Sequence, residues 1–268
     1  MTHYKAIDGT TYAYSLEGKG EPLVLLHGFT GTKETWQYFI EEKKSNYRIL
    51  SIDMPGHGKT VAKQKVTMEE FVEDLHHLTR HLQFHSFHLL GYSFGGRSAL
   101  SYALRYPDTI RTLILESASP GLATAEEREN RMAKDKLLAE MIIEKGLKHF
   151  VAYWENIPLF ATQKQLSEAE KMAIRNERLS QSAIGLAQSL LGMGTGVQAS
   201  NWKELSSINF PLLLMVGSLD QKFVEINEAM AKEVETSELH LVEGAGHAIH
   251  VEFKAKFVKI VSDYIEKY

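Results

Sequence analysis

The chain of 268 residues contains no cysteine. This absence excludes disulfide bonds, thiol catalysis, and zinc or iron–sulfur sites built on cysteine. No apolar run approaches the roughly 18 residues that a membrane-spanning helix needs. The stretch Met1 to Lys5 carries no apolar signal segment. We therefore expect a cytoplasmic protein with no membrane partner.

An excess of charge of either sign is also missing. Lysine and arginine number 30 and aspartate and glutamate 34, which gives a net charge of −4. Such a balance disfavours a dedicated nucleic-acid binder. Hydrophobic residues make up 44% of the chain and charged residues 24%, the profile of a globular protein. At ~150 residues per domain, the length predicts one large domain or a domain with a sizeable insert.

Short apolar runs alternate with helical patterns in the first part of the chain. The runs are typical of strands buried on both faces. Thr67 with Glu70 three residues later matches a helix start, and Pro107 ends another helix. We expect strands at 12–16, 23–26, 47–52, 87–91 and 113–116, and helices at 67–82 and 93–105. This order predicts an α/β fold with a mostly parallel, doubly wound sheet.

The alternation stops after Gly121. Between residues 121 and 199 there is no strand candidate, and helical patterns cover 126–145, 147–154, 167–179 and 182–191. A strand at 211–217, a helix at 224–234, a strand at 239–242 and a helix at 251–266 then follow. We therefore predict a core formed by residues 1–120 and 200–268, interrupted by a helical cap at 121–199.

The segment Gly91-Tyr92-Ser93-Phe94-Gly95-Gly96 carries the clearest chemical signal. It is a G-x-S-x-G pattern between a predicted strand and a predicted helix, the context of a nucleophile elbow. Glycine is needed on either side because the sharp turn leaves no room for side chains. The turn exposes the Ser93 hydroxyl above the sheet. The Phe94 N–H, at the helix start, points towards developing negative charge.

A second donor of this kind is expected after the strand at 23–26. The loop there begins His27-Gly28-Phe29. In this architecture a backbone N–H from that loop completes the oxyanion hole, and Phe29 is the predicted donor. His27 is interpreted as a structural hydrogen-bonding residue.

A serine hydroxyl needs a base and an orienting acid. The expected chain order is serine, acid, histidine. Asp220 follows the strand at 211–217, and His247 follows the strand at 239–242. Both therefore lie at the sheet edge where Ser93 lies. His250 is the alternative base, but the glycine turn before His247 favours His247.

Three histidines recur every four residues, at positions 77, 81 and 85. That spacing can bind a metal, but no accompanying carboxylate motif is present. We interpret the three as a solvated helix face and expect no metal site.

Together these motifs resemble the α/β-hydrolase superfamily. The resemblance rests on His27-Gly28-Phe29, on the segment from Asp53 to Gly58, on the elbow, and on Asp220 and His247. It covers essentially the whole chain and implies that 121–199 is the cap. The fold hosts many reactions, so the chemistry needs further residues.

A second set of residues points to one family within this superfamily. Arg97 follows Ser93 by one helical turn, Pro120-Gly121-Leu122 opens the cap, and Trp154 precedes Pro158-Leu159-Phe160. With these features the chain resembles the 2-succinyl-6-hydroxy-2,4-cyclohexadiene-1-carboxylate synthases of menaquinone biosynthesis. That family eliminates pyruvate from a cyclohexene precursor bearing several carboxylates.

The resemblance implies roles for particular positions. Ser93, His247 and Asp220 form the catalytic triad, with Ser93 acting as a base. The substrate would be held by residues of the elbow and the cap, namely Tyr92, Arg97, Arg131, Trp154 and Arg175, with Arg128 as the alternative to Arg131. Arg131 and Arg175 lie on apolar helix faces, where charges are usually paired or functional. The expected partner is a small polycarboxylate, and no metal or organic cofactor is implied.

Two alternatives remain open. The same triad serves a carboxylic-ester, thioester or C–C bond hydrolase that forms an acyl-enzyme. A small-molecule receptor on this fold would keep the triad for ligand capture. Release of pyruvate, release of an acid and an alcohol, or binding without turnover would distinguish the three. Serine at position 93 excludes an aspartate-nucleophile dehalogenase.

Overall fold

The computed structural model describes residues 1–62 and 64–268. Within these residues a single nine-stranded sheet has the order β1-β2-β4-β3-β6-β7-β8-β9, and β5 pairs with β2. The pairings from β4 to β9 are parallel, whereas β1 and β2 are antiparallel to their neighbours. The α/β prediction is confirmed. The strands are β1 (Thr2–Ile7), β2 (Thr10–Gly18), β3 (Glu21–Leu26), β4 (Tyr47–Ile52), β5 (Val61–Ala62), β6 (Phe87–Tyr92), β7 (Ile110–Glu116), β8 (Leu212–Gly217) and β9 (Ser237–Val242).

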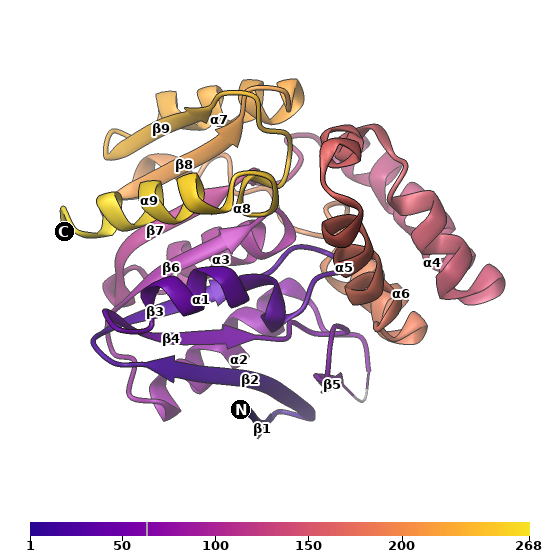
Figure 1. Cartoon of the computed structure of the whole chain (residues 1–268), viewed down its shortest axis with the longest axis horizontal. Coiled ribbons are helices and arrows are strands. Elements are labelled where there is room, and N and C mark those ends of the chain that lie inside the picture. The colour runs from indigo at the N-terminus through magenta and orange to yellow at the C-terminus, as the bar shows by residue number, and fades with distance from the viewer. Residues whose placement is uncertain (63) are drawn as a thin grey trace.

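Helices cover both faces of this sheet (Figure 1). Side chains alternate between the faces because successive residues of a strand point in opposite directions. Val24 and Leu26 join the core with α2 and α3, whereas Leu23 and Leu25 join the core with α1 and α9. The helices of these two layers are α1 (Gln37–Lys43), α2 (Met68–His81), α3 (Phe94–Arg105), α7 (Gln221–Glu233), α8 (Ile249–Glu252) and α9 (Lys254–Ile265).

A helical insertion separates β7 from β8. It comprises α4 (Ala125–Trp154), the 3-10 segment η3 (Pro158–Gln165), α5 (Glu168–Leu179) and α6 (Ala183–Met193). Figure 1 shows these helices beyond the carboxyl ends of the parallel strands. They share a core of their own, which includes Ile142, Phe150 and Leu186. No described helix, the 30-residue α4 included, has the apolar length to cross a membrane.

Local sequence signals set several of the element boundaries. Thr67 caps α2 and forms the expected capping box with Glu70. Gly146, with φ 78°, interrupts α4 where the sequence predicted two helices. The predicted helix at 251–266 is divided at Phe253 into α8 and α9. The sequence analysis assigned neither β1, where only Ile7 is fully buried, nor α1, where seven residues include only Phe39 and Ile40 as buried ones.

Candidate active site

The serine predicted as nucleophile stands in a sharp turn between β6 and α3. Ser93 has φ 48° and ψ −102°, a strained backbone for a residue other than glycine. A Cβ at Gly91 would lie 2.4 Å from the Gly95 carbonyl oxygen, and one at Gly95 would lie 2.2 Å from the Leu26 carbonyl oxygen. Close backbone approach therefore explains both glycines and lifts the hydroxyl above the sheet.

Ser93 lies at the end of a chain of hydrogen bonds. The Nε2 atom of His247 is 2.9 Å from the Ser93 Oγ. The Nδ1 atom of His247 is 2.6 Å from the Asp220 Oδ2. The histidine is only 1% exposed, so solvent does not compete for these bonds. With Asp220 on Nδ1, Nε2 is free to accept a proton from the serine, as a general base must.

His250, the alternative base, has a different partner. Its Nδ1 lies 2.8 Å from the Glu116 Oε2, and its backbone N–H donates to the Glu116 Oε1 at 3.0 Å. The Tyr92 ring packs against both histidines, with its centre 5.4 Å from that of His247 and 4.6 Å from that of His250. The structure therefore assigns the serine to His247 and leaves His250 in a buried pair beneath it.

Two backbone amides border the serine. Phe94 is the first residue of α3, so its N–H has no partner within the helix. The Phe29 N–H, in the loop after β3, donates to no backbone acceptor among the described loop and turn hydrogen bonds. Both residues line the same cavity as Ser93. The two amides are therefore available to a ligand oxygen, which is what an oxyanion hole requires.

Two buried histidines support the loop that carries Phe29. His27 uses both ring nitrogens, Nδ1 towards the Gly28 carbonyl at 2.8 Å and Nε2 as acceptor from the Met54 N–H at 3.0 Å. Its ring centre lies 5.1 Å from that of His57. Burial lowers the pKa of His27 to about 4 and that of His57 to about 3. Both are therefore neutral structural residues at ordinary pH.

The serine opens into a cavity of about 510 Å³ between the sheet edge and the helical insertion. Tyr92, Arg97, Arg131 and Trp154, which the sequence predicted as ligand contacts, line it. Trp154 Nε1 and Ser189 Oγ, also at this cavity, are buried polar atoms without a protein partner among the described residues. Buried polar groups are rarely left unpaired, so these two atoms are candidates for a bond to water or to a bound ligand.

Arg97 is the most unusual charge in the cavity. Its guanidinium donates to the Gln198 Oε1 and, at 3.1 Å, to the Met193 carbonyl. Within the described residues no carboxylate lies in ion-pair distance of Arg97. Burial and, secondarily, nearby Arg131 lower the pKa of Arg97 to about 9. Binding of an anion beside this buried cation would stabilise its charge, which no carboxylate of the described residues balances.

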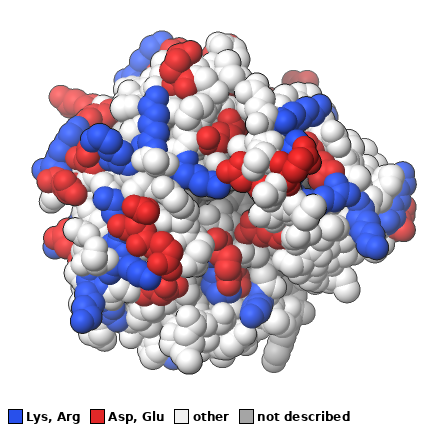
Figure 2. Space-filling view, viewed as in Figure 1, with Lys and Arg blue, Asp and Glu red and all other residues white. Residues whose placement is uncertain are grey.

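Arg131, rather than Arg128, lines the cavity. Its Nε donates to the Asp135 Oδ1 at 2.7 Å. The other oxygen of Asp135 is buried without a partner among the described residues. On the face of the molecule seen in Figure 2, basic and acidic side chains are interspersed.

Arg175 does not line this cavity, contrary to the expectation from the sequence. It pairs with Glu155 and borders a separate hollow. The apolar face inferred from Met172 is an outer face of α5, because Met172 is 62% exposed. Periodicity alone could not reveal which side of this short helix is covered.

The buried arginine of α5 is Arg178, which the sequence analysis did not identify. It is only 6% exposed. Its guanidinium carbon lies 4.8 Å from the centre of the Phe160 ring, and Nη2 donates to the Gln163 Oε1 at 3.3 Å. Phe160 lines the catalytic cavity on its other side. Lys222, two residues after Asp220, is another cavity cation that was not predicted as a contact.

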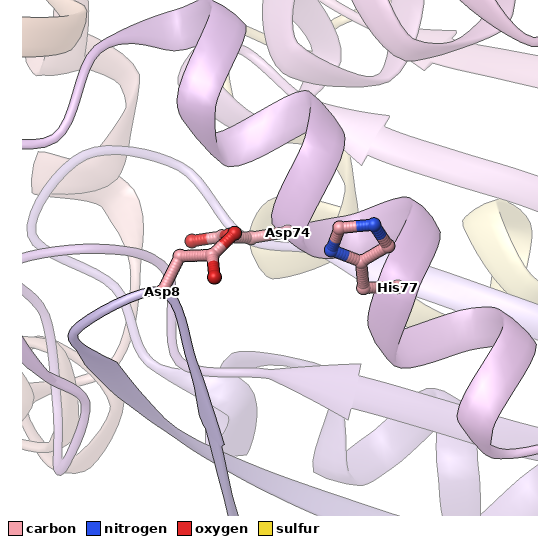
Figure 3. A group of neighbouring side chains, drawn as sticks. All are labelled: Asp8, Asp74 and His77. Carbon is pink, nitrogen blue, oxygen red and sulfur yellow. The ribbon is translucent and has the colours of Figure 1, made fainter.

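In the part of the chain that the structure describes, three residues of types that can bind a metal lie together away from the cavity, as Figure 3 shows. Asp8, Asp74 and His77 place ligand atoms within 4.8 Å of one another. None of the three lines the catalytic cavity. Asp74 already accepts a hydrogen bond of 2.6 Å from the Tyr12 hydroxyl, and burial raises the pKa of Asp74. The arrangement ties α2 to the β2 strand, and neither His81 nor His85 belongs to it.

Comparison with known proteins narrows the possibilities. The alpha/beta hydrolase fold family matches residues 21–254. A Bacillus subtilis protein, provisionally named a 2-succinyl-6-hydroxy-2,4-cyclohexadiene-1-carboxylate synthase, is 44% identical over 96% of both chains. The synthase of that name from Klebsiella pneumoniae is 31% identical over 85% of this chain and 87% of its own.

A solved structure agrees with these relatives. MenH from Staphylococcus aureus superimposes with a TM-score of 0.91 at 34% identity, covering 96% of this chain and 98% of that one. An esterase from Thermogutta terrifontis has the same fold, with a TM-score of 0.86 at 26% identity over 100% of this chain and 98% of that one. The chain therefore belongs to the alpha/beta hydrolase fold family and, within it, to the 2-succinyl-6-hydroxy-2,4-cyclohexadiene-1-carboxylate synthases.

Proposed function

We propose that this chain is a carbon–oxygen lyase of menaquinone biosynthesis. It eliminates pyruvate from 2-succinyl-5-enolpyruvyl-6-hydroxy-3-cyclohexene-1-carboxylate and leaves 2-succinyl-6-hydroxy-2,4-cyclohexadiene-1-carboxylate. The observation that carries the proposal is the position of Ser93 and His247 at a cavity that also holds Arg97, a buried cation without a carboxylate partner among the described residues. A base facing a polyanion-binding cavity fits this reaction.

The chemical step begins at the serine. His247 Nε2 accepts the Oγ proton, and Oγ removes the proton from the ring carbon that bears the succinyl group, α to its ketone. The electron pair forms a ring double bond at that carbon, the existing double bond shifts by one position, and the C–O bond to the enolpyruvyl group breaks. The enolate of pyruvate leaves with the electron pair of the broken C–O bond, and its protonation on carbon gives pyruvate. Asp220 stabilises the imidazolium of His247 meanwhile.

The oxyanion hole has a specific task in this step. As the α-proton leaves, negative charge develops on the succinyl ketone oxygen. The N–H groups of Phe29 and Phe94 would hold that oxygen as an enolate. Preorganised donors of this kind stabilise the charge without reorganising at the moment of reaction.

The substrate carries three carboxylates, one each on the succinyl chain, the ring and the enolpyruvyl group. Arg97 and Arg131 would bind two of them, and Trp154 Nε1 would donate to a ligand oxygen. Arg175 and Arg178 both border the neighbouring hollow rather than the catalytic cavity itself. We assign the third cation to Arg178, because it is buried against Phe160, whose ring lines the cavity. Arginine suits these positions because its planar fork meets a carboxylate with two hydrogen bonds.

The helical insertion, residues 121–199, would act as the cap over this reaction. Arg131 and Trp154 reach the cavity from the insertion, whereas Ser93 and Arg97 reach it from the core. Binding the carboxylates from two sides orients the acidic C–H towards the Ser93 Oγ. This orientation raises the rate of proton transfer through proximity. The partner of the protein in this proposal is the small polycarboxylate itself.

Ester hydrolysis through an acyl-enzyme is the second candidate, because the geometry of the triad and the esterase-like fold also suit it. The test is to quench the reaction during turnover, quantify pyruvate and weigh the intact protein. We expect stoichiometric pyruvate, no burst phase and no adduct on Ser93. An acyl-sized increment during turnover of the natural substrate would instead establish the hydrolase.

A further inference from the structure

The last turn of α5 is bonded to the loop that carries the Phe29 amide. Glu177 Oε1 accepts from the Thr32 N–H at 2.9 Å, from the Thr32 hydroxyl at 2.8 Å and from the Thr35 hydroxyl at 2.8 Å. Thr32 caps the 3-10 segment η1 (Lys33–Trp36), which follows the loop directly, and Thr35 is the third residue of that segment. One carboxylate of the cap therefore holds the far end of this core loop.

Gln181, just beyond α5, holds the middle of the loop. Its Nε2 donates to the Thr30 and Gly31 carbonyls, each at 3.1 Å. Its Oε1 accepts from the Gly58 N–H at 2.9 Å. The side chain is only 7% exposed. Both ends of this buried amide are thus used to join two core loops to the cap.

The segment that these residues hold is one that needs support. Thr30 has φ 71°, a left-handed backbone that costs free energy for a residue other than glycine. Phe29 and Thr30 are the two central residues of the turn from Gly28 to Gly31, so a change at Thr30 would open the turn that orients the Phe29 N–H. A strained conformation persists only where surrounding contacts determine it. Here the Gly31 N–H closes the turn on the Gly28 carbonyl at 3.0 Å, and Gln181 of the cap adds its bonds to the Thr30 and Gly31 carbonyls.

We propose that Glu177 and Gln181 are positioning residues for the reaction, resting on the proposed function above. They hold the oxyanion-hole loop so that the Phe29 N–H points into the cavity, and they make that orientation depend on the docked cap. Arg178 lies between them in the chain, so a carboxylate drawn to Arg178 would settle the helix end that aligns the loop. Substrate capture and oxyanion stabilisation are thereby coupled.

The first test separates kcat from KM. Misplacing one oxyanion donor forfeits part of the roughly 10²–10³-fold that such a donor contributes. We expect Gln181→Ala and Gln181→Glu each to lower kcat about 10–100-fold, with KM changed less than threefold. Gln181→Glu keeps the acceptor for Gly58 but loses both donors, so it should not rescue. Glu177→Gln keeps an acceptor oxygen and should retain more kcat than Glu177→Ala.

The control is Glu168→Gln, which alters a surface ion pair with Lys171 at the other end of the same helix. It should leave kcat within twofold of wild type. A Gln181→Ala enzyme with unchanged kcat would overturn the proposal. So would a loss confined to KM or to the thermal unfolding midpoint, since either would mean that the contacts only secure the cap.

The second readout needs no turnover. Hydrogen exchange of the amides of residues 27–35 should be faster in Gln181→Ala and Glu177→Ala than in wild type and in Glu168→Gln. If the wild-type enzyme released no pyruvate, the proposed function would fail. The exchange measurement would still test whether Glu177 and Gln181 hold the loop. Unchanged exchange in both variants would show that Glu177 and Gln181 do not hold the loop, whatever the reaction is.

Discussion

Arg178 lies against the face of Phe160, with its guanidinium carbon 4.8 Å from the ring centre. The same ring lies 6.2 Å from that of His247. A single aromatic side chain thus separates a buried cation from the proposed catalytic base. Cation–π contact compensates only part of the hydration that the arginine loses. A carboxylate that displaced Phe160 would complete the compensation.

This relationship predicts different results for two neighbouring arginines. Arg178→Ala should lower kcat/KM for the natural substrate about 10–150-fold, since a hydrogen bond to a charged group contributes roughly 1.5–3 kcal/mol. Arg175→Ala should lower it less than threefold, because Arg175 is part of a half-exposed pair with Glu155. Steady-state pyruvate release measures both. The reverse order would return the third cation to Arg175.

Removal of the serine hydroxyl should abolish turnover without unfolding the protein. Ser93→Ala, His247→Ala and Asp220→Asn should each lower kcat on the order of 10⁴-fold, the typical loss for a triad member. Binding of the substrate should persist in Ser93→Ala, since the arginines remain. Calorimetric titration and pyruvate release check the two halves. Near-wild-type turnover by Ser93→Ala would exclude the serine as base.

Arg97 offers a test of charge against geometry. Arg97→Ala should lower kcat/KM about 10–150-fold, and Arg97→Lys should recover only part, because an ammonium cannot reproduce the two-bond fork. A neutral activated ester should be much less affected than the anionic substrate by either change. Equal losses on both substrates would indicate general destabilisation instead. Comparing the two rates for each variant decides the matter.

The elbow glycines should tolerate no methyl group. Gly95→Ala would place Cβ 2.2 Å from the Leu26 carbonyl oxygen, a backbone atom that cannot move aside. We expect a loss of about 3 kcal/mol or more in the free energy of unfolding. Gly9→Ala is the matched comparison, because nothing lies within 4 Å and only its φ of 89° is unfavourable. It should cost about 1 kcal/mol in urea unfolding.

Acid should destabilise the protein through His27 and His57. Burial depresses their folded-state pKa values to about 4 and about 3, below the ~6.5 of an unfolded histidine. The unfolded state therefore binds more protons, and stability present above about pH 6.5 is lost as the pH falls towards those values. Urea unfolding between pH 7.5 and 4.5 should show this slope.

A substitution identifies the source of that slope. His57→Asn should flatten the pH dependence, although stability at pH 7.5 also falls because packing is lost. His81→Asn, on the exposed face of α2, is the control for removal of a surface histidine. If the slope were the same in wild type and His57→Asn, the acid sensitivity would have to reside elsewhere.

Local chemistry made much of this protein predictable. The capping box at Thr67 and Glu70 set the start of α2, and the glycines around Ser93 permitted only one kind of turn. Parallel strands end at one edge of the sheet, so the loops carrying Ser93, Asp220 and His247 had to converge there. Each of these signals acts within a few residues or follows from strand direction, so no knowledge of packing was needed.

The cap was different. A helix such as α5 presents several faces, and its sequence did not say which face the core covers. Packing against the loop after β3 buried Gln181 and bonded the half-buried Glu177. Arg178 is buried against Phe160, whereas Arg175 is left in a surface pair. The tertiary structure also pairs His250 with Glu116, which leaves His247 as the histidine that contacts Ser93. The sequence by itself determined the fold and the nucleophile. Only the tertiary structure decided which cations and acids share a space, because charge pairing depends on distances between segments far apart in the chain.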